Sequence, residues 1–257
     1  MNTTHSAETH GVDTMTDTMT DTMSDTVTGT TATTMKLTCI NFNCKDFCSS
    51  AEYIACLAKK CDILCLSETW LRPENLHVID SVLQNTLDSD FQVFAKSSMN
   101  DLDGAHRGRP FGGMAVICKR KPGLLFNELE VDCVRAINVC DDAGNVIHLV
   151  LSVYLPFYCA DNTDDFIHTL DHIQALIDNR PNNCPIKMMG DFNVQLPSLS
   201  RLAPRWERAA GFNPHSKLMY DFLCANDLVT CDLFCQQPVR YTYFCLSRCN
   251  ISCIYLL

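Results

Sequence analysis

The stretch MMGDFNV, residues 188–194, has the pattern of a buried strand that ends in two polar side chains. The apolar run at 186–189 predicts the end of the strand, and Gly190 allows the backbone to turn there. Residues two apart in an extended chain point the same way, so we expect Asp191 and Asn193 to face one reacting centre. A carboxylate can orient a water or accept its proton, and a carboxamide can donate to a phosphate oxygen. The stretch therefore indicates chemistry on a phosphate ester, if other segments supply the remaining groups.

Four other polar side chains stand at or near the ends of predicted strands. Glu68 follows the apolar run at 63–66, where a carboxylate could hold Mg²⁺, an ion that takes few protein carboxylates and keeps waters for a phosphate to displace. Asn41 ends the first strand, Tyr154 has a hydroxyl that could donate to a phosphate oxygen, and Thr242 could hydrogen-bond a catalytic neighbour. Taken singly, each has a plainer explanation as a turn residue, a half-buried aromatic or a strand threonine. Their order along the chain makes the set informative.

Strands and helices alternate after the first 35 residues. The Asp-Asp-Ala-Gly-Asn run at 141–145 predicts a hairpin turn between two of the strands. Long hairpin-connected strands mixed with single helices favour two sheets packed face to face, with helices outside. Strands are predicted at 37–42, 63–66, 91–95, 113–118, 131–140, 146–153, 186–189, 229–233 and 241–244, and helices at 49–59 (capped by Ser50), 164–177 and 216–225.

The composition suits one large α/β or β-sandwich domain, since the 257 residues are 47% hydrophobic. No segment has the apolar length of a membrane span, and the polar, acidic start does not have the form of a secretory signal. The formal net charge is −10, and residues 36–257 carry 25 acidic against 20 basic residues. This balance argues against nucleic acid as a partner, which usually meets a basic surface, unless several of the acids surround a metal ion.

Residues 1–34 form a low-complexity leader in which Thr-Met-Thr-Asp recurs with a period of four. Because it has few large apolar groups to offset its ordering entropy, we expect it to be disordered, with the domain occupying residues 35–257. The seventeen cysteines are scattered through apolar runs, and without an export signal we interpret them as reduced thiols that serve as small buried hydrophobes. Examples are Cys39, Cys65, Cys118, Cys140 and Cys224.

Two groups of metal-binding side chains have a zinc-like spacing but lack a full ligand set. His168 and His172 lie one helical turn apart among the acidic residues of a predicted surface helix, where plain solvation explains them better. Cys245, Cys249 and Cys253 recur every four residues, whereas zinc sites usually show shorter Cys-x-x-Cys spacing and a fourth ligand. A cysteine-rich zinc module is therefore only an alternative.

As an ordered set, these motifs resemble the endonuclease/exonuclease/phosphatase superfamily. The closest branch is the apurinic-type endonuclease domain of non-LTR (LINE-like) retrotransposons, which the Ser-Glu-Thr-Trp-Leu and Arg-Tyr-Thr-Tyr-Phe forms favour. The resemblance runs from about Met35 to the last residue. The motifs that carry it are Asn41, Ser67-Glu68-Thr69-Trp70, Gly112-Gly113, Tyr154-Leu155-Pro156, Gly190-Asp191-Phe192-Asn193 and Tyr241-Thr242-Tyr243-Phe244.

The resemblance implies an α/β fold, a four-layer α-β-β-α sandwich of two mixed β-sheets flanked by helices and incomplete at the C-terminus. The site would lie at one edge of the two sheets. The resemblance also implies a divalent ion, normally Mg²⁺ and alternatively Mn²⁺. By position, Glu68 would hold the metal, and Asn41 would support the metal–phosphate cluster.

The resemblance further implies hydrolysis of a DNA phosphodiester by an in-line water. Asp191 would orient or deprotonate that water. Asn193 and Tyr154 would bind phosphate oxygens, and Thr242 would buttress the site. In such sites the ion neutralises developing charge, and the protein mostly positions the reacting groups.

The last part of the sequence departs from the family pattern. The family has a Ser-x-Ile-Asp-Tyr segment, whereas residues 252–255 here read Ser-Cys-Ile-Tyr, without the Asp. The family also has a final strand that ends in Ser-Asp-His, and the sequence stops at Leu257 before such a motif. That His would contact the scissile phosphate, and the Asp would hold the His. We therefore expect the domain to lack its last strands and to be impaired in activity, because groups that act as a unit are not replaced piecemeal.

Two other functions are open at the level of the sequence. A phosphatase of the same fold could act on inositol phosphates or phospholipids, which the acidic charge favours and the Thr-Trp-Leu context after Glu68 opposes. A remnant of a nuclease could also bind nucleic acid without cleaving it. The retroelement resemblance implies an intracellular, nuclear protein that acts on the DNA backbone, with no role at a membrane.

Overall fold

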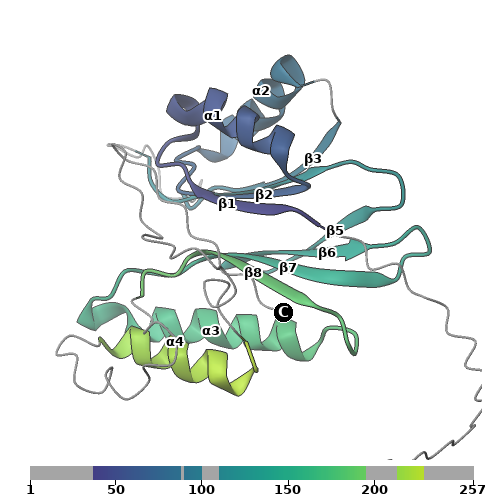
Figure 1. The fold of residues 1–257 in the computed structure, drawn as a ribbon. Coiled ribbons are helices and arrows are strands. Elements are labelled where there is room, and N and C mark those ends of the chain that lie inside the picture. The colour runs from purple at the N-terminus through teal and green to yellow at the C-terminus, as the bar shows by residue number, and fades with distance from the viewer. Residues whose placement is uncertain (1–36, 88–89, 100–109, 195–212, 229–257) are drawn as a thin grey trace, which may run out of the picture. The chain divides into compact units, whose positions relative to one another are not determined.

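A computed structural model of the protein describes residues 37–87, 90–99, 110–194 and 213–228 (Figure 1). Within these residues, eight strands form two four-stranded sheets, and helices cover the outer face of each sheet. The predictions of a disordered leader at 1–34 and of strands at 229–233 and 241–244 lie outside the described residues.

The first sheet, sheet A, has the strand order β1-β2-β4-β3. It is mixed, because β1 runs parallel to β2 while β4 pairs antiparallel with both β2 and β3. All five residues of β2 are buried, since the strand is central and both of its faces are covered. The strands of sheet A are β1 (Cys39–Asn43), β2 (Ile63–Ser67), β3 (Phe91–Lys96) and β4 (Met114–Lys119).

The second sheet, sheet B, has the order β5-β6-β7-β8 and is also mixed, with β8 parallel to β7 and the other pairs antiparallel. The predicted hairpin turn is confirmed between β6 and β7, where the backbone N–H of Asp141 donates to the Asn145 carbonyl at 3.0 Å and Gly144 has a φ of +84°. The strands of sheet B are β5 (Leu125–Leu129), β6 (Val134–Cys140), β7 (Val146–Tyr154) and β8 (Ile186–Asp191).

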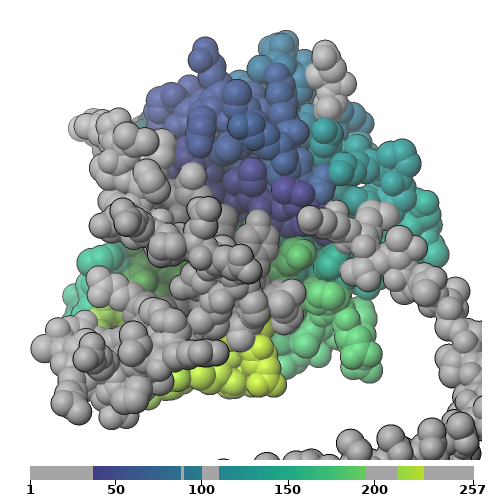
Figure 2. All heavy atoms as spheres, in the orientation of Figure 1, coloured from purple at the N-terminus to yellow at the C-terminus, as the bar shows by residue number. Residues whose placement is uncertain are grey.

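Two helices lie on the outer face of each sheet. Helices α1 (Phe47–Lys60) and α2 (Val78–Thr86) cover sheet A, and α3 (Thr163–Asp178) and α4 (Pro214–Ala225) cover sheet B. Figure 2 shows these two coverings as the blue atoms of α1 and α2 and the yellow atoms of α4. Short 3-10 helices, η1 (Pro73–Asn75) and η3 (Ala160–Asn162), precede α2 and α3.

The predicted cap of the first helix is wrong by one turn. Helix α1 begins after Asp46, whose side chain accepts a hydrogen bond from the backbone N–H of Cys48. Ser50 lies inside the helix instead, where its hydroxyl donates to the Cys44 carbonyl at 3.0 Å. Asp46 competes better for the cap because its carboxylate accepts the orphan N–H groups at the helix start.

Three separate apolar clusters correspond to the three interfaces between layers. The first lies between sheet A and its helices around Phe42, Phe47 and Ile54. The second lies between sheet B and its helices around Phe166 and Ile173, and the third lies between the two sheets. The predicted four-layer α-β-β-α sandwich is therefore confirmed for the described residues. None of the helices in this part of the chain combines the length and the apolar character needed to span a bilayer.

The inner face of sheet A changes character along β1 and β2. Cys39 on β1 and Ile63 and Cys65 on β2 belong to the apolar cluster between the sheets. Further along the same face come polar side chains, Asn41 and Asn43 on β1 and Ser67 on β2, which is paired in register with Asn43. The polar end of this face is therefore built into the alternation of the two strands.

The interpretation of the cysteines as buried, reduced thiols holds for most of those that the structure describes. Among the twelve described cysteines, seven are buried and none forms a disulfide. Cys224 is an exception, because it lies on the exposed side of α4. The buried group comprises Cys39, Cys44, Cys61, Cys65, Cys118, Cys140 and Cys184.

Candidate active site

Polar side chains from both sheets meet where four strands end. Asn43 is the last residue of β1, and Glu68 directly follows β2. In sheet B, Tyr154 ends β7 and is paired in register with Asp191, the last residue of β8. Because both strand pairs are parallel, their carboxyl ends lie at the same edge of each sheet. The fold thus brings residues that are far apart in the sequence to one place.

Asn43 connects the two carboxylates across the sheets. Its Nδ2 donates to Glu68 Oε1 and to Asp191 Oδ2, both at 2.9 Å. Asn43 is 2% exposed, so the amide end of these charge-assisted hydrogen bonds is shielded from water, whereas Glu68 and Asp191 are half-buried. The same side chain leaves its Oδ1 buried without a hydrogen-bond partner among the described residues.

Tyr154 and Asn193 complete the group. The Tyr154 hydroxyl donates to Glu68 Oε1 at 3.3 Å. Burial and the neighbouring charges of Glu68 and Asp191 raise the pKa of Tyr154 to about 12, so its phenol keeps its proton at neutral pH. The backbone N–H of Asn193 donates to Asp191 Oδ1 at 3.2 Å, and its side-chain amide donates to the Leu155 carbonyl at 2.8 Å.

The backbone around the site adopts conformations that most residues avoid. Glu68, Trp70 and Asn193 have φ values of +55°, +51° and +48°. Such left-handed residues persist only where the surrounding structure holds them, and they cluster at functional sites. Here the N–H groups of Thr69 and Trp70 donate to the carbonyls of Gly113 and Gly112, at 3.2 and 2.9 Å. These bonds fix the loop that carries Glu68.

Gly190 is required by close packing of the backbone. A side chain at this position would collide with the Val153 carbonyl of the neighbouring strand β7. The glycine therefore lets β8 run close to β7 and deliver Asp191 beside Tyr154. This explains why the stretch that predicts the site contains a glycine directly before its carboxylate.

The structure brings together four of the six predicted site residues: Glu68, Asp191, Tyr154 and Asn193. Asn41 lies two residues before Asn43 on the same face of β1. It is 1% exposed, and neither of its side-chain amide atoms has a partner among the described residues. Asn43, two residues further along the strand and not part of the predicted set, makes the contacts to Glu68 and Asp191. The period-two alternation of the strand contains the signal, since both asparagines share one face. Thr242 lies outside the described residues.

The donor set suits a hard divalent ion. Within the described residues, no group of three or more His, Cys, Asp or Glu side chains is placed to hold a metal. However, the carboxylates of Glu68 and Asp191 share one neighbour, because the Nδ2 of Asn43 lies 2.9 Å from an oxygen of each. The Oδ1 of the same amide is buried without a partner among the described residues. Mg²⁺ prefers oxygen ligands, needs only one or two carboxylates and keeps its waters. The two carboxylates of Glu68 and Asp191, held on either side of one amide, therefore fit such an ion.

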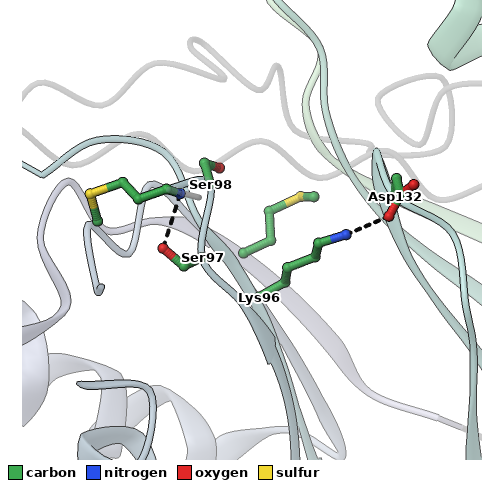
Figure 3. Close-up of a pocket in the computed structure, with 6 residues that line it drawn as sticks. Lys96, Ser97, Ser98 and Asp132 are labelled. Carbon is green, nitrogen blue, oxygen red and sulfur yellow. Dashed lines mark hydrogen bonds and ion pairs between the residues drawn. The ribbon is translucent and has the colours of Figure 1, made fainter. Parts of the chain in front are cut away.

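Two adjoining pockets open beside these residues. One, of about 530 Å³, contains Glu68 and Tyr154 and has Trp70, Phe111 and Ser98 in its walls. The other has the same volume and also reaches Ser98. In its wall, Lys96 of sheet A forms an ion pair of 2.6 Å with Asp132 of the β5–β6 loop (Figure 3). Ser98 thus stands between the candidate active site and a second hollow that spans both sheets.

The two histidines with a zinc-like spacing make other contacts. The His168 and His172 rings meet edge to face, with centroids 4.2 Å apart. His172 Nδ1 is 3.2 Å from the Cys133 thiol, a hydrogen-bond contact between α3 and the start of β6. The three cysteines at 245–253 lie outside the described residues.

The fold is shared with solved DNA-processing enzymes. A 3′ phosphatase, NExo, from Neisseria, solved with a product DNA hairpin, is 12% identical, with a TM-score of 0.57 over 86% of each chain. An AP endonuclease from Archaeoglobus fulgidus is 16% identical, with a TM-score of 0.55 over 83% of this chain and 80% of that one. At such identities the likeness concerns the fold alone.

Sequence comparison identifies the family. The curated proteins include no match to this chain. Residues 41–229, well over half of the sequence, match the model of the Endonuclease/Exonuclease/phosphatase family. This range contains Asn43, Glu68, Tyr154, Asp191 and Asn193, all the polar residues that the structure gathers at the strand ends. The chain therefore belongs to the endonuclease/exonuclease/phosphatase family.

Proposed function

We propose that this chain is a divalent-metal-dependent phosphodiesterase that acts on the backbone of DNA. The observation that carries the proposal is the Asn43 amide, which bridges Glu68 of one sheet and Asp191 of the other at 2.9 Å each. Enzymes of this family hydrolyse phosphate esters and generally use divalent metals. The solved relatives named above process DNA, which supports DNA as the substrate.

Glu68 and Asp191 would hold the ion, for which Mg²⁺ is the first choice and Mn²⁺ the alternative. Asn43 would keep the two carboxylates together through its amide nitrogen. When bound, such an ion neutralises the charge that develops on the phosphate oxygens. It would also explain how an acidic protein meets a polyanion, because a bound cation reverses the local field.

The remaining groups have roles that follow from their contacts. Asp191 accepts the proton of the water whose oxygen attacks phosphorus, while the bond from phosphorus to the leaving strand breaks. The Asn193 N–H holds Asp191 in place for this task. Tyr154, whose pKa of about 12 keeps the phenol protonated, donates to a phosphate oxygen. The second N–H of the Asn193 amide, beyond the one that binds Leu155, can do the same.

We assign the chain to the retrotransposon branch of the family, which acts on DNA in the nucleus, from its Ser-Glu-Thr-Trp-Leu and Arg-Tyr-Thr-Tyr-Phe sequences. The Ser-Cys-Ile-Tyr sequence at 252–255 lacks the family's Asp, so we expect slow turnover. Thr242 keeps its proposed role as a support of the site.

The test is nicking of supercoiled plasmid by the full chain with Mg²⁺, with Mn²⁺ and with EDTA, together with Mn²⁺ binding measured by electron paramagnetic resonance. We expect slow, metal-dependent nicking that Glu68→Gln and Asp191→Asn abolish, with Mn²⁺ affinity reduced in both. The matched controls Glu52→Gln and Asp171→Asn remove exposed carboxylates on α1 and α3 and should change neither result. Nicking that persists in both site variants, or a Mn²⁺ affinity that is unchanged in them, would overturn the proposal.

A further inference from the structure

The pocket that contains Glu68 and Tyr154 has aromatic walls. Trp70 and Phe111 both line it, and Phe111 is 57% exposed, an unusual position for a large apolar ring. None of the described residues that line this pocket carries a positive charge. Among the described residues, a ligand that enters it therefore meets flat apolar surfaces and the Glu68 carboxylate rather than basic side chains.

The two aromatic residues are held in a fixed relation by the backbone. The Trp70 N–H donates to the carbonyl of Gly112, the residue that follows Phe111, at 2.9 Å. Gly113 is held in turn, because its N–H donates to the Ser98 hydroxyl at 2.7 Å. The segments that carry both rings are thus tied to each other and to the loop of Glu68. Such pre-organisation lowers the entropy lost when a ligand is bound.

We propose that Trp70 and Phe111 form a stacking platform for one unpaired nucleobase beside the phosphodiester that is cut. This inference rests on the proposed function and adds the form of the substrate: nucleic acid with a base free of its partner, as in a single strand or an opened duplex. Aromatic side chains stack on any base, because every base has a π-face. Inositol phosphates and lipid headgroups have no such face and gain nothing from these rings.

The charge of the pocket supports the same assignment. Non-specific nucleic-acid binding usually comes from Lys and Arg contacts to phosphates and falls steeply with salt. Because the described walls of this pocket provide no Lys or Arg, we expect stacking to supply most of its share of the affinity when no metal is bound. Binding at this pocket should consequently depend on the presence of bases and depend little on ionic strength.

The experiment uses the fluorescence of Trp70. The chain has two tryptophans, so Trp206→Phe leaves Trp70 as the single emitter. This protein is titrated, in EDTA to prevent cleavage, with a twelve-nucleotide single strand and with an abasic strand that has the same number of phosphates. We expect the strand with bases to quench Trp70, and the abasic strand to leave its emission unchanged. Equal binding and quenching by both strands would overturn the inference.

Phe111→Ala then tests the second ring. It should weaken binding of the base-containing strand by about 5- to 150-fold, whereas Phe111→Tyr should retain it. Phe157→Ala is the matched control, because this ring is 74% exposed and is not among the described residues that line the pocket. Equal losses in Phe111→Ala and Phe157→Ala would contradict a specific platform.

The nicking assay separates this inference from the proposed function. If the platform is wrong, Mg²⁺-dependent nicking persists and its kcat/KM is the same in Phe111→Ala. If the proposed function is wrong, no variant or metal gives nicking, while base-dependent quenching of Trp70 can still be scored. Quenching by inositol hexakisphosphate to the same extent as by the single strand would also refute the platform.

Discussion

Cys39 and Asn43 stand at the two ends of strand β1, yet they lie in opposite environments between the sheets. Cys39 belongs to a cluster of buried apolar side chains drawn from both sheets. Around Asn43, buried polar atoms of Asn41, Ser67 and Thr69 have no hydrogen-bond partner among the described residues. Folded proteins satisfy nearly all buried polar groups, so such a concentration calls for a functional reason. The apolar end stabilises the sandwich, whereas the buried polar groups at the other end form a site and lower the stability.

The largest effect should come from the carboxylates at the polar end. Asp191→Asn should lower the rate of phosphodiester cleavage by about 100- to 1,000-fold, because it removes the proton acceptor and one metal ligand. The free energy of unfolding should not fall, since one of two neighbouring negative charges is removed. Plasmid nicking and urea denaturation measure the two quantities. A loss of activity in proportion to a loss of stability would mean that the polar end is structural.

A substitution at Gly190 tests how closely β7 and β8, the strands that carry Tyr154 and Asp191, need to pack. Gly190→Ala should cost about 3 kcal/mol of unfolding free energy, because the new Cβ collides with the Val153 carbonyl. Gly144→Ala is the control, since its Cβ would meet no atom within 4 Å and only its φ of +84° opposes the change. That substitution should cost about 1 kcal/mol. Equal midpoints in urea for the two variants would refute the packing argument.

A substitution at Asn41 tests whether its buried amide lowers the free energy of unfolding. Asn41→Leu should raise the free energy of unfolding by about 1 kcal/mol, because both amide atoms are buried without a partner among the described residues. Ile63→Val, at the apolar end, should lower it by about 1 kcal/mol. Thermal and urea unfolding of both variants compare the two ends directly. Destabilisation by Asn41→Leu would show instead that Asn41 has a partner elsewhere in the chain.

The smallest effect concerns pH. Burial and the charges of Glu68 and Asp191 raise the pKa of Tyr154 from 10.0 to about 12. The folded protein therefore holds this proton more tightly than the unfolded chain. The contribution of protonated Tyr154 to the free energy of unfolding is complete below pH 10 and is lost as the pH rises towards 12. Wild-type stability should fall more steeply over this interval than that of Tyr154→Phe. The same pH dependence of the free energy of unfolding in the two proteins between pH 10 and 12 would contradict this prediction.

Much of the fold follows from simple alternation in the sequence. The buried run of β2 and the hairpin at 141–145 have unambiguous patterns, so the two-sheet architecture could be predicted. Strand β5 was not predicted, because its sequence LFNEL mixes exposed and buried positions at a sheet edge. Helix α2 was also missed, since it is nine residues long and has no side-chain cap. Tertiary packing rather than local signals defines these two elements.

The site was harder to predict than the fold because its members lie in separate segments. Glu68, Tyr154 and Asp191 stand directly at strand ends, where the sequence pattern and the family motifs agree. The sequence motifs mark Asn41 and not Asn43, although both lie on one face of β1. The choice depends on which of them reaches the opposite sheet, and only the three-dimensional arrangement determines this.

The buried thiols between the two sheets can report when the sheets separate. Cys65 and Cys118 are 0% exposed, and burial raises the pKa of each above its ordinary value. Alkylating reagents need both access and a thiolate, so these two sulfurs react only when the sheets part. Cys48 and Cys56 are exposed and react without any such event. Mass spectrometry of the alkylated chain would thus time the separation of the layers without any substitution in the sequence.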